Sequence, residues 1–171
     1  IEYCSCLIRH GASRLVFLNA HRGNNSCIEA ASRILIADHP VRIGMLSVWK
    51  LANDLTSGSG LVKEGKFTHA GEIMTSLILA TRPDTVRRDR MEADQVQSPA
   101  GSAFKVNNSL GETSFRGSVQ IVYQDIRDVT QTGVMGDPTT ATADKGEEIL
   151  RVIADYVKAF LQEFRKLTMS V

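Results

Sequence analysis

The chain has 171 residues, of which 43% are hydrophobic and 23% charged, close to the average for a soluble globular domain. This composition excludes a disordered, collagen-like or disulfide-stapled protein, and no apolar run reaches the roughly 18 residues of a spanning helix. Twenty basic and 19 acidic side chains leave a net charge of +1, so we expect neither a nucleic-acid nor a membrane partner. Three cysteines, Cys4, Cys6 and Cys27, cannot all pair within the chain, which indicates a reducing, cytoplasmic location.

The first fifty residues have the pattern of a βαβ unit. Residues 1–10 have helical spacing and are followed by Gly11, a typical residue after a helix end. The apolar run 15–18 predicts a strand buried on both faces of a parallel sheet. A capping-box sequence at Ser26 predicts a helix that ends near residues 38–40, and the β-rich stretch 41–49 predicts the next strand, ending at Trp49.

The rest of the chain alternates between helical and irregular patterns. Residues 68–80 predict a helix that Pro83 stops, and residues 84–117 have little periodicity and predict a long loop. A strand is expected over 119–123, and a strongly amphipathic helix over 143–167. The alternation of strands and helices indicates an α/β layer architecture.

The first candidate site follows the first predicted strand. In an open parallel sheet, ligands bind beyond the carboxyl ends of the strands, where His21, Gly23 and Asn24 are expected. A neutral imidazole suits a divalent transition metal, the glycine permits close backbone approach, and the asparagine could cap the next helix. The alternative is an ordinary surface histidine, since no second histidine stands at zinc-motif spacing.

The second candidate site opens the helix expected at residue 68. His69 would have its basicity lowered by the helix dipole, which suits a general base, and Glu72 follows three residues later. The alternative is ordinary helix-start chemistry, with Thr68 as the cap and Glu72 complementing the dipole. Trp49, the single tryptophan, is either core or the wall of a pocket.

A third polar segment, 133–142, is rich in glycine and precedes the last helix. It lacks the lysine of a phosphate-binding loop, so a turn leading into a capped helix explains it.

These three segments, in this order, resemble the creatininase (creatinine amidohydrolase) family. Residues 10–24, HGASRLVFLNAHRGN, are similar to the family's strand that ends in N-G-H-G-G-N. Residues 68–86, THAGEIMTSLILATRPDTV, resemble its H-A-G-E-x-E-T-S helix and Pro-Asp/Glu-x-Val stop. Residues 132–150, TGVMGDPTTATADKGEEIL, resemble its G-V-x-G-D-P-x-x-A-T-x-x-K-G segment.

The resemblance implies a three-layer αβα fold with a mostly parallel sheet, as one domain over residues 1–171. It implies a divalent metal, zinc or manganese or else iron, and hydrolysis of C–N amide bonds of small molecules by a metal-activated water. It also implies a homo-oligomer, a hexamer built from trimers.

The resemblance also assigns roles to single residues. His21 matches the family's metal-ligand histidine, and His69 matches the histidine that assists proton transfer or substrate orientation. Glu72 joins His69 as a catalytic candidate, and we place Trp49, Gly23 and Asn24 in the substrate pocket.

The sequence departs from the family at four places. Ile1 corresponds to a point well inside the family's domain, so the Glu-x-His and Asp ligands of its N-terminal segment are expected to be missing. Met74 replaces a second acidic residue, Arg22 replaces a glycine, and Gly65 replaces an aromatic residue of creatinine-specific members. These departures favour two alternatives, a catalytically impaired homologue that serves as an assembly subunit, or a fragment of a longer chain.

Overall fold

The computed structural model describes residues 1–64 and 68–168, and divides the chain into two compact units. Unit 1 comprises residues 1–51 and 152–171, and unit 2 comprises residues 52–151. The last helix, α6 (Ala143–Phe164), contributes residues to both units. The expectation of one domain over the whole chain stays a prediction.

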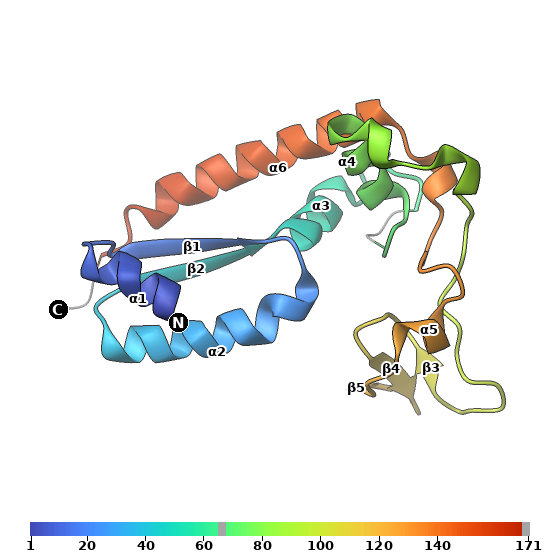
Figure 1. Cartoon of the computed structure of the whole chain (residues 1–171), viewed down its shortest axis with the longest axis horizontal. Helices are drawn as coiled ribbons and strands as arrows, with labels where there is room; N and C mark the ends of the chain where they lie inside the picture. The colour runs from blue at the N-terminus through green and yellow to red at the C-terminus, as the bar shows by residue number, and fades with distance from the viewer. Residues whose placement is uncertain (65–67, 169–171) are drawn as a thin grey trace. The chain divides into compact units, whose positions relative to one another are not determined.

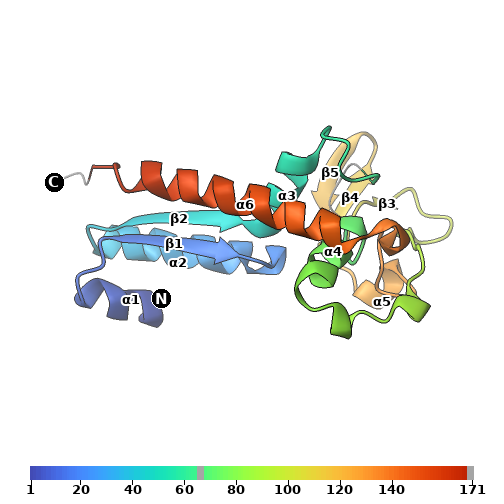
Figure 2. The same cartoon turned by 90° about the horizontal axis from the view of Figure 1, so that it is seen from above.

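Unit 1 is built on a βαβ arrangement. Its elements in chain order are α1 (Glu2–Arg9), β1 (Arg14–Asn19), the short 3-10 helix η1 (Arg22–Asn24), α2 (Asn25–Asp38) and β2 (Arg42–Ser47). β1 and β2 pair in parallel along their whole length, from Arg14 opposite Arg42 to Asn19 opposite Ser47. α2 covers one face of this pair and the second half of α6 covers the other (Figures 1 and 2). The predicted α/β class with a parallel sheet is therefore confirmed.

Close packing positions α6 on β2. Gly44 lies under the aromatic rings of α6, and a Cβ atom there would lie 3.2 Å from Phe164 and 3.6 Å from Phe160. The two rings stack with their centroids 5.7 Å apart. The absence of a side chain at Gly44 thus lets the helix approach the sheet.

Three predictions within unit 1 are wrong in detail. α2 begins at Asn25, so Ser26 lies inside the helix instead of capping it. β2 ends at Ser47, and Trp49 lies in the first turn of α3 (Val48–Thr56) instead of at the end of a strand. Apolar residues at 48, 51, 52 and 55 have helical spacing, which outweighs the β preference of Val48 and Trp49. Leu18 is 57% exposed, so β1 is not buried on both faces.

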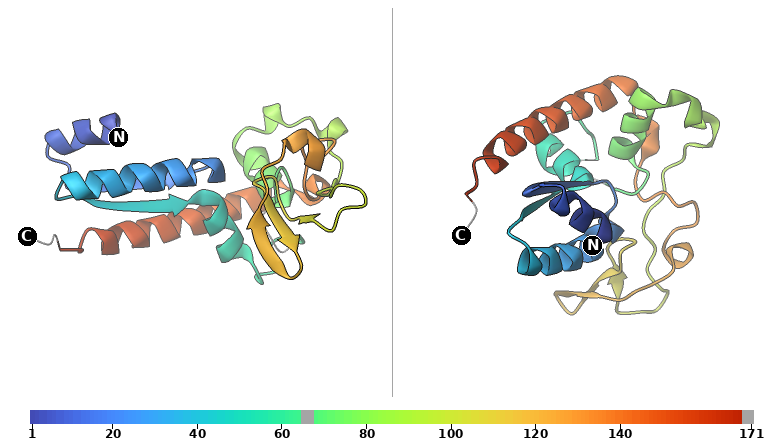
Figure 3. Two further views of the ribbon diagram at one scale, coloured as in Figure 1. Left: turned by 90° about the horizontal axis from the view of Figure 1, so that it is seen from below. Right: turned by 60° about the vertical axis from the view of Figure 1, so that its left-hand side comes forward.

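Unit 2 holds the remaining elements. They are α4 (Glu72–Thr81), two short 3-10 helices η2 (Pro83–Thr85) and η3 (Arg88–Arg90), β3 (Lys105–Val106), β4 (Glu112–Phe115), β5 (Ser118–Ile121), α5 (Ile126–Val129) and η4 (Pro138–Thr140). β3, β4 and β5 form an antiparallel sheet, and β4 and β5 form its hairpin (Figure 3, left). The stretch 84–117 is thus partly ordered into strands, contrary to the expected loop.

Local conformation explains two boundaries in unit 2. Arg116 and Gly117, with φ of 47° and 82°, form the two-residue turn of the hairpin, since a turn of this kind needs left-handed residues. Ala70 also has a left-handed φ of 54°, which no helix interior accepts. α4 therefore starts at Glu72, four residues later than expected.

Buried apolar side chains on α4 and α6 form the core of unit 2, with Ile73, Leu79 and Ile149 almost fully inaccessible to solvent. A second cluster joins Val106, Val129 and Met135. Among the described residues, no helix combines the length and apolar character needed to cross a bilayer.

Candidate functional site

In unit 1, the His21 loop at the end of β1 is organised by one buried amide. The side chain of Asn19 accepts from the backbone N–H of His21 at 3.2 Å and from the amide of Asn24 at 3.3 Å. It donates to the carbonyl of His21 at 2.8 Å and to the side chain of Asn25 at 2.7 Å. Asn19 therefore fixes the backbone on both sides of the His21 peptide, a role that the sequence did not reveal.

The His21 ring lies over Gly23. A Cβ atom at Gly23 would lie 2.8 Å from Cε1 and 2.9 Å from Nδ1 of the ring, closer than nonbonded atoms approach. The absence of a side chain at Gly23 therefore leaves room for the imidazole in this position.

The other residues expected in the substrate pocket also lie in this loop or contact it. The indole N–H of Trp49 donates to the carbonyl oxygen of Ala20, next to His21. Asn24 directs its amide to Asn19 and makes no side-chain cap on α2. The structure thus gathers His21, Gly23, Asn24 and Trp49 around one loop of unit 1.

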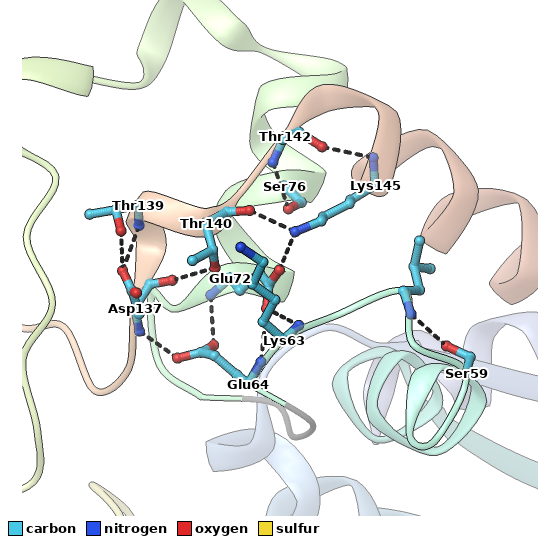
Figure 4. Close-up of polar contacts among 11 residues, drawn as sticks. Ser59, Lys63, Glu64, Glu72, Ser76, Asp137, Thr139, Thr140, Thr142 and Lys145 are labelled. Atoms are coloured by element: carbon cyan, nitrogen blue, oxygen red, sulfur yellow. Dashed lines mark hydrogen bonds and ion pairs between the residues drawn. The ribbon is translucent and has the colours of Figure 1, made fainter.

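In unit 2, the start of α4 carries a buried carboxylate. Glu72 is fully buried, and one of its oxygens accepts from the backbone N–H groups of Lys63 at 2.6 Å and Glu64 at 3.0 Å. The other oxygen pairs with the ammonium of Lys145, which also donates to the carbonyl of Thr140 at 2.7 Å (Figure 4). Both oxygens of Glu72 are thus occupied by groups other than His69.

Burial alone would raise the pKa of Glu72, but donors outweigh it. The hydrogen bond from Lys145, followed by those from the backbone of Glu64 and Lys63, lowers the pKa of Glu72 below its usual value. Glu72 is therefore an ionised, fully paired carboxylate near neutral pH.

A second carboxylate, Glu64, joins three segments of unit 2. It accepts from the Thr68 hydroxyl at 3.0 Å and from the backbone N–H of Glu72 at 2.8 Å, and from the backbone N–H of Asp137. It thus satisfies the first N–H of α4, where Gly71 provides no side-chain cap. The expectation that Thr68 caps this helix is wrong, since its hydroxyl donates to Glu64.

His69 precedes α4 with an exposed ring. Its Nδ1 lies 2.6 Å from the carbonyl oxygen of Gly133. A carbonyl can only accept, so Nδ1 carries the proton and Nε2 of the neutral ring carries a lone pair. This is the state in which a histidine can take a proton or bind a metal.

The structural roles of Asn19, Glu64 and Lys145 were not predicted from the sequence. Lys145 stands in the quoted segment 132–150, so the resemblance contained a signal for it. Glu64 lies eight residues before its partner Glu72, in a stretch whose pattern indicates only a loop, and nothing there marks it.

A bound metal ion needs several donor side chains that lie close together. His21 offers an exposed imidazole, which fits one ligand of a divalent ion. Across residues 1–64 and 68–168, however, no three His, Cys, Asp or Glu side chains lie close enough to hold an ion together. His21 thus stays a candidate for one metal ligand. Gly65, whose identity argued against creatinine, lies outside the described residues.

Unit 1 thus has a histidine loop at the end of a parallel strand, and unit 2 has a histidine just before a helix. The family model described as creatinine amidohydrolase, Creatininase, matches residues 1–161. The chain belongs to the creatininase family.

Individual relatives agree with this placement. The chain is 33% identical over 144 residues to a mycofactocin precursor peptide peptidase from Mycobacterium ulcerans, covering 84% of this chain and 46% of that protein. It is 28% identical over 167 residues to a creatinine amidohydrolase from Pseudomonas putida, covering 89% and 57%. The chain thus spans about half the length of these curated relatives.

Solved structures share the fold. A creatinine amidohydrolase candidate from Bacteroides fragilis superposes with a TM-score of 0.74 at 23% identity, covering 99% of this chain and 61% of that one. A creatininase structure described as the manganese form superposes with a TM-score of 0.66 at 29% identity, covering 95% and 61%.

Proposed function

We propose that this chain carries part of a metal-dependent hydrolase that cleaves C–N amide bonds, with His69 as the proton-transfer residue. The observation that carries the proposal is the hydrogen bond from His69 Nδ1 to the Gly133 carbonyl. It leaves Nε2, on an exposed ring, able to accept a proton from a nucleophile and return it to a leaving amine.

His21 would hold the metal, with its ring seated over Gly23. A divalent zinc, manganese or iron ion, when bound, supplies a Lewis acid that polarises an amide carbonyl and acidifies water. One solved structure of similar fold is described as a manganese form and another as a Zn-Zn type, which supports these two metals. Trp49, Gly23 and Asn24, gathered around the same loop, would line the substrate pocket.

Glu72 serves this site best as a positioning residue. Its carboxylate is fully buried, and both oxygens already accept hydrogen bonds, one from Lys145 and the other from two backbone N–H groups. It instead ties the start of α4, which follows His69, to the first turn of α6.

Two substrate classes have support. The relative from Pseudomonas putida is named for creatinine, a cyclic amide, and favours a small-molecule amide substrate. The relative from Mycobacterium ulcerans is named as a peptide peptidase, which favours a peptide bond. The reaction type is the same in both cases.

The test uses protein expressed from the complete reading frame, stripped of metal and reloaded with zinc, manganese or iron. Hydrolysis of creatinine and of a short peptide amide is measured for the native protein, for His69→Gln and for the control His39→Gln, which alters a histidine of unit 1 after α2. We expect metal-dependent hydrolysis of one substrate class, lost in His69→Gln and kept in His39→Gln. Failure to bind any of the three metals would overturn the proposal.

The second candidate is a non-catalytic subunit that acts through assembly. Met74 stands where a carboxylate is usual, and a thioether cannot replace it toward a hard metal or a proton. Arg22 adds a cation beside the His21 loop. We also propose a homo-oligomer in the cytoplasm, with a trimer-based hexamer as the expected mass in light scattering. A stable hexamer without hydrolysis would favour this candidate over the enzyme.

A further inference from the structure

A loop of unit 2, residues 130–136, lies between Asp94 and His69. Its end forms an isolated antiparallel bridge with Asp94, in which Asp94 N–H donates to Gly136 O at 3.0 Å and Gly136 N–H donates to Asp94 O at 2.7 Å. One residue earlier, Met135 N–H donates to the backbone carbonyl of His69 at 2.8 Å. The loop is thus bonded through its backbone to both residues.

The side chain of Asp94 holds the beginning of the same loop. Its Oδ2 accepts from the hydroxyl of Thr132 at 2.8 Å and from the backbone N–H of Thr132 at 3.3 Å. The Thr130 hydroxyl lies 2.9 Å both from Oδ2 and from the Val134 carbonyl oxygen, so these two acceptors share its one hydrogen. Its Oδ1 accepts from the backbone N–H of Gln95 at 2.7 Å. The hydrogen bonds from Thr132, Thr130 and Gln95 lower the pKa of Asp94 to about 2, so it is an anionic acceptor at neutral pH.

The hydroxyls of Thr130 and Thr132 also accept hydrogen bonds from the backbone around Gly133, whose carbonyl contacts His69. The Gly133 N–H donates to the Thr130 hydroxyl at 3.1 Å, and the Val134 N–H donates to the Thr132 hydroxyl at 3.2 Å. Gly133 itself has a left-handed φ of 85°, a conformation that glycine adopts without strain. The backbone N–H groups on both sides of the Gly133 carbonyl are therefore linked to the Asp94 carboxylate through one threonine hydroxyl each.

We infer that Asp94 is a positioning residue for His69. Its carboxylate orders Thr130 and Thr132 so that the Gly133 carbonyl selects the imidazole form with the proton on Nδ1 and the lone pair on Nε2. In water a neutral histidine carries its proton on either nitrogen, and only a fixed acceptor makes one form dominate. This inference rests on the proposed function for the use made of Nε2, and on the structure alone for the protonation of Nδ1.

The first test measures which ring nitrogen of His69 carries the proton. Protein labelled with ¹⁵N-histidine is examined by long-range ¹H–¹⁵N correlation at a pH where the rings are neutral, and the His69 signal is assigned by its loss in His69→Gln. We expect the Nδ1–H pattern for His69 in the native protein and a shift toward the Nε2–H pattern in Asp94→Asn. In that variant the amide has one oxygen in place of two, so either the donors of Thr132 or the N–H of Gln95 would face an NH₂ group and lose their acceptor.

Two controls show whether a change in the His69 signal is specific. His10 donates from Nδ1 to the carbonyl of Cys6 at 2.8 Å in unit 1, so its Nδ1–H pattern should stay unchanged in every variant. Asp84→Asn removes a carboxylate paired with Arg82 on the surface of the same unit and should leave His69 unchanged. A native His69 with an Nε2–H pattern would overturn the inference.

A second pair of variants covers the case in which Asp94→Asn does not fold. Thr132→Val removes the hydroxyl at nearly constant shape, and Thr132→Ser keeps it. We expect the His69 pattern to shift in Thr132→Val and to be native in Thr132→Ser. Equal patterns in these two folded variants would contradict the role assigned to Asp94.

Hydrolysis is a separate readout. With an active enzyme, we expect Asp94→Asn to lower kcat about tenfold, with KM changed less than about twofold, since general-base assistance contributes at least this much to rate. Shifted His69 signals in a protein without hydrolysis would uphold the inference and reject the proposed function. Unchanged signals in a protein that hydrolyses amides would do the reverse.

Discussion

Lys145, in the first turn of α6, forms an ion pair with Glu72, the buried first residue of α4, across 73 positions of the chain. The side chain of Lys145 is 19% exposed and that of Glu72 is fully buried. Its ammonium also donates to the Thr140 carbonyl, so one cation satisfies both a buried carboxylate and a carbonyl of η4. The pair links the two helices that form the core of unit 2.

Replacing Lys145 by methionine should destabilise unit 2 by about 3 kcal/mol, since removing one partner leaves a buried charge uncompensated. Urea unfolding followed by circular dichroism measures this loss. The matched control is Lys166→Met, which breaks the exposed pair of Lys166 with Glu163 and should cost at most about 1 kcal/mol. Equal losses of unfolding free energy in the two variants would show that the buried pair contributes no more to stability than the exposed pair.

Stability should depend on pH through Glu72. Its pKa in the folded protein lies below its ordinary value of 4.5, so between the two values the unfolded chain binds more protons. The stabilisation is therefore complete above the unfolded value and is lost as pH falls through the folded pKa. Unfolding midpoints measured from about pH 6 to about pH 3 should fall more steeply for the native protein than for Glu72→Gln. Parallel pH curves would contradict the assignment.

Gly146 permits the close contact of α6 with α4. A Cβ atom there would lie 2.0 Å from the carbonyl oxygen of Ser76 and 2.8 Å from the Cβ of Ala80. Helix propensity alone would make Gly146→Ala stabilising by about 1 kcal/mol. Because the obstacle is backbone, we expect a net destabilisation of about 2 kcal/mol or more, from forced separation of the helices. A rise in melting temperature would refute this packing argument.

Gly23→Ala should weaken metal binding without unfolding the protein. The new methyl group would displace the His21 ring, and disturbing the support of a ligand lowers metal affinity by about tenfold or more. Calorimetric titration with zinc measures the effect. The control is Ser26→Ala, at the exposed second residue of α2, and His21→Ala marks the full loss. A native zinc affinity in Gly23→Ala would show that the position of the His21 ring over Gly23 does not matter for metal binding.

Periodicity in the sequence predicted elements that have strong local signals. The helix over 143–167, the β1 and β2 strands, and the end of α1 before Gly11 all follow from apolar spacing and one glycine. The position of Trp49 is predicted wrongly because the β preference of residues 41–49 extends past the point where the helical spacing of α3 begins. The boundary depends on which face is buried, a property of the tertiary structure.

The sites were predictable to a smaller degree. His21 and His69 stand out as candidates because histidine near a strand end or a helix start is conspicuous, and the roles that the resemblance assigns to them stay predictions. Asn19, Glu64 and Asp94 were not found, because their importance lies in the backbone groups they bind. Such partners lie up to 73 positions away for Glu64, and no local pattern encodes them.

Two of the long-range contacts of unit 2 have a consequence for how it folds. Glu64 with Asp137 and Glu72 with Lys145 are both separated by 73 positions. They therefore close largely the same chain loop, offset by eight residues at each end. The entropy of closing that loop is lost once, by whichever contact forms first, and the second then forms at little further entropic cost. The β4–β5 hairpin, with its two-residue turn, lies inside this interval and forms from neighbouring residues alone. We therefore expect the hairpin to assemble early and the joining of α4 to α6 to limit the folding rate.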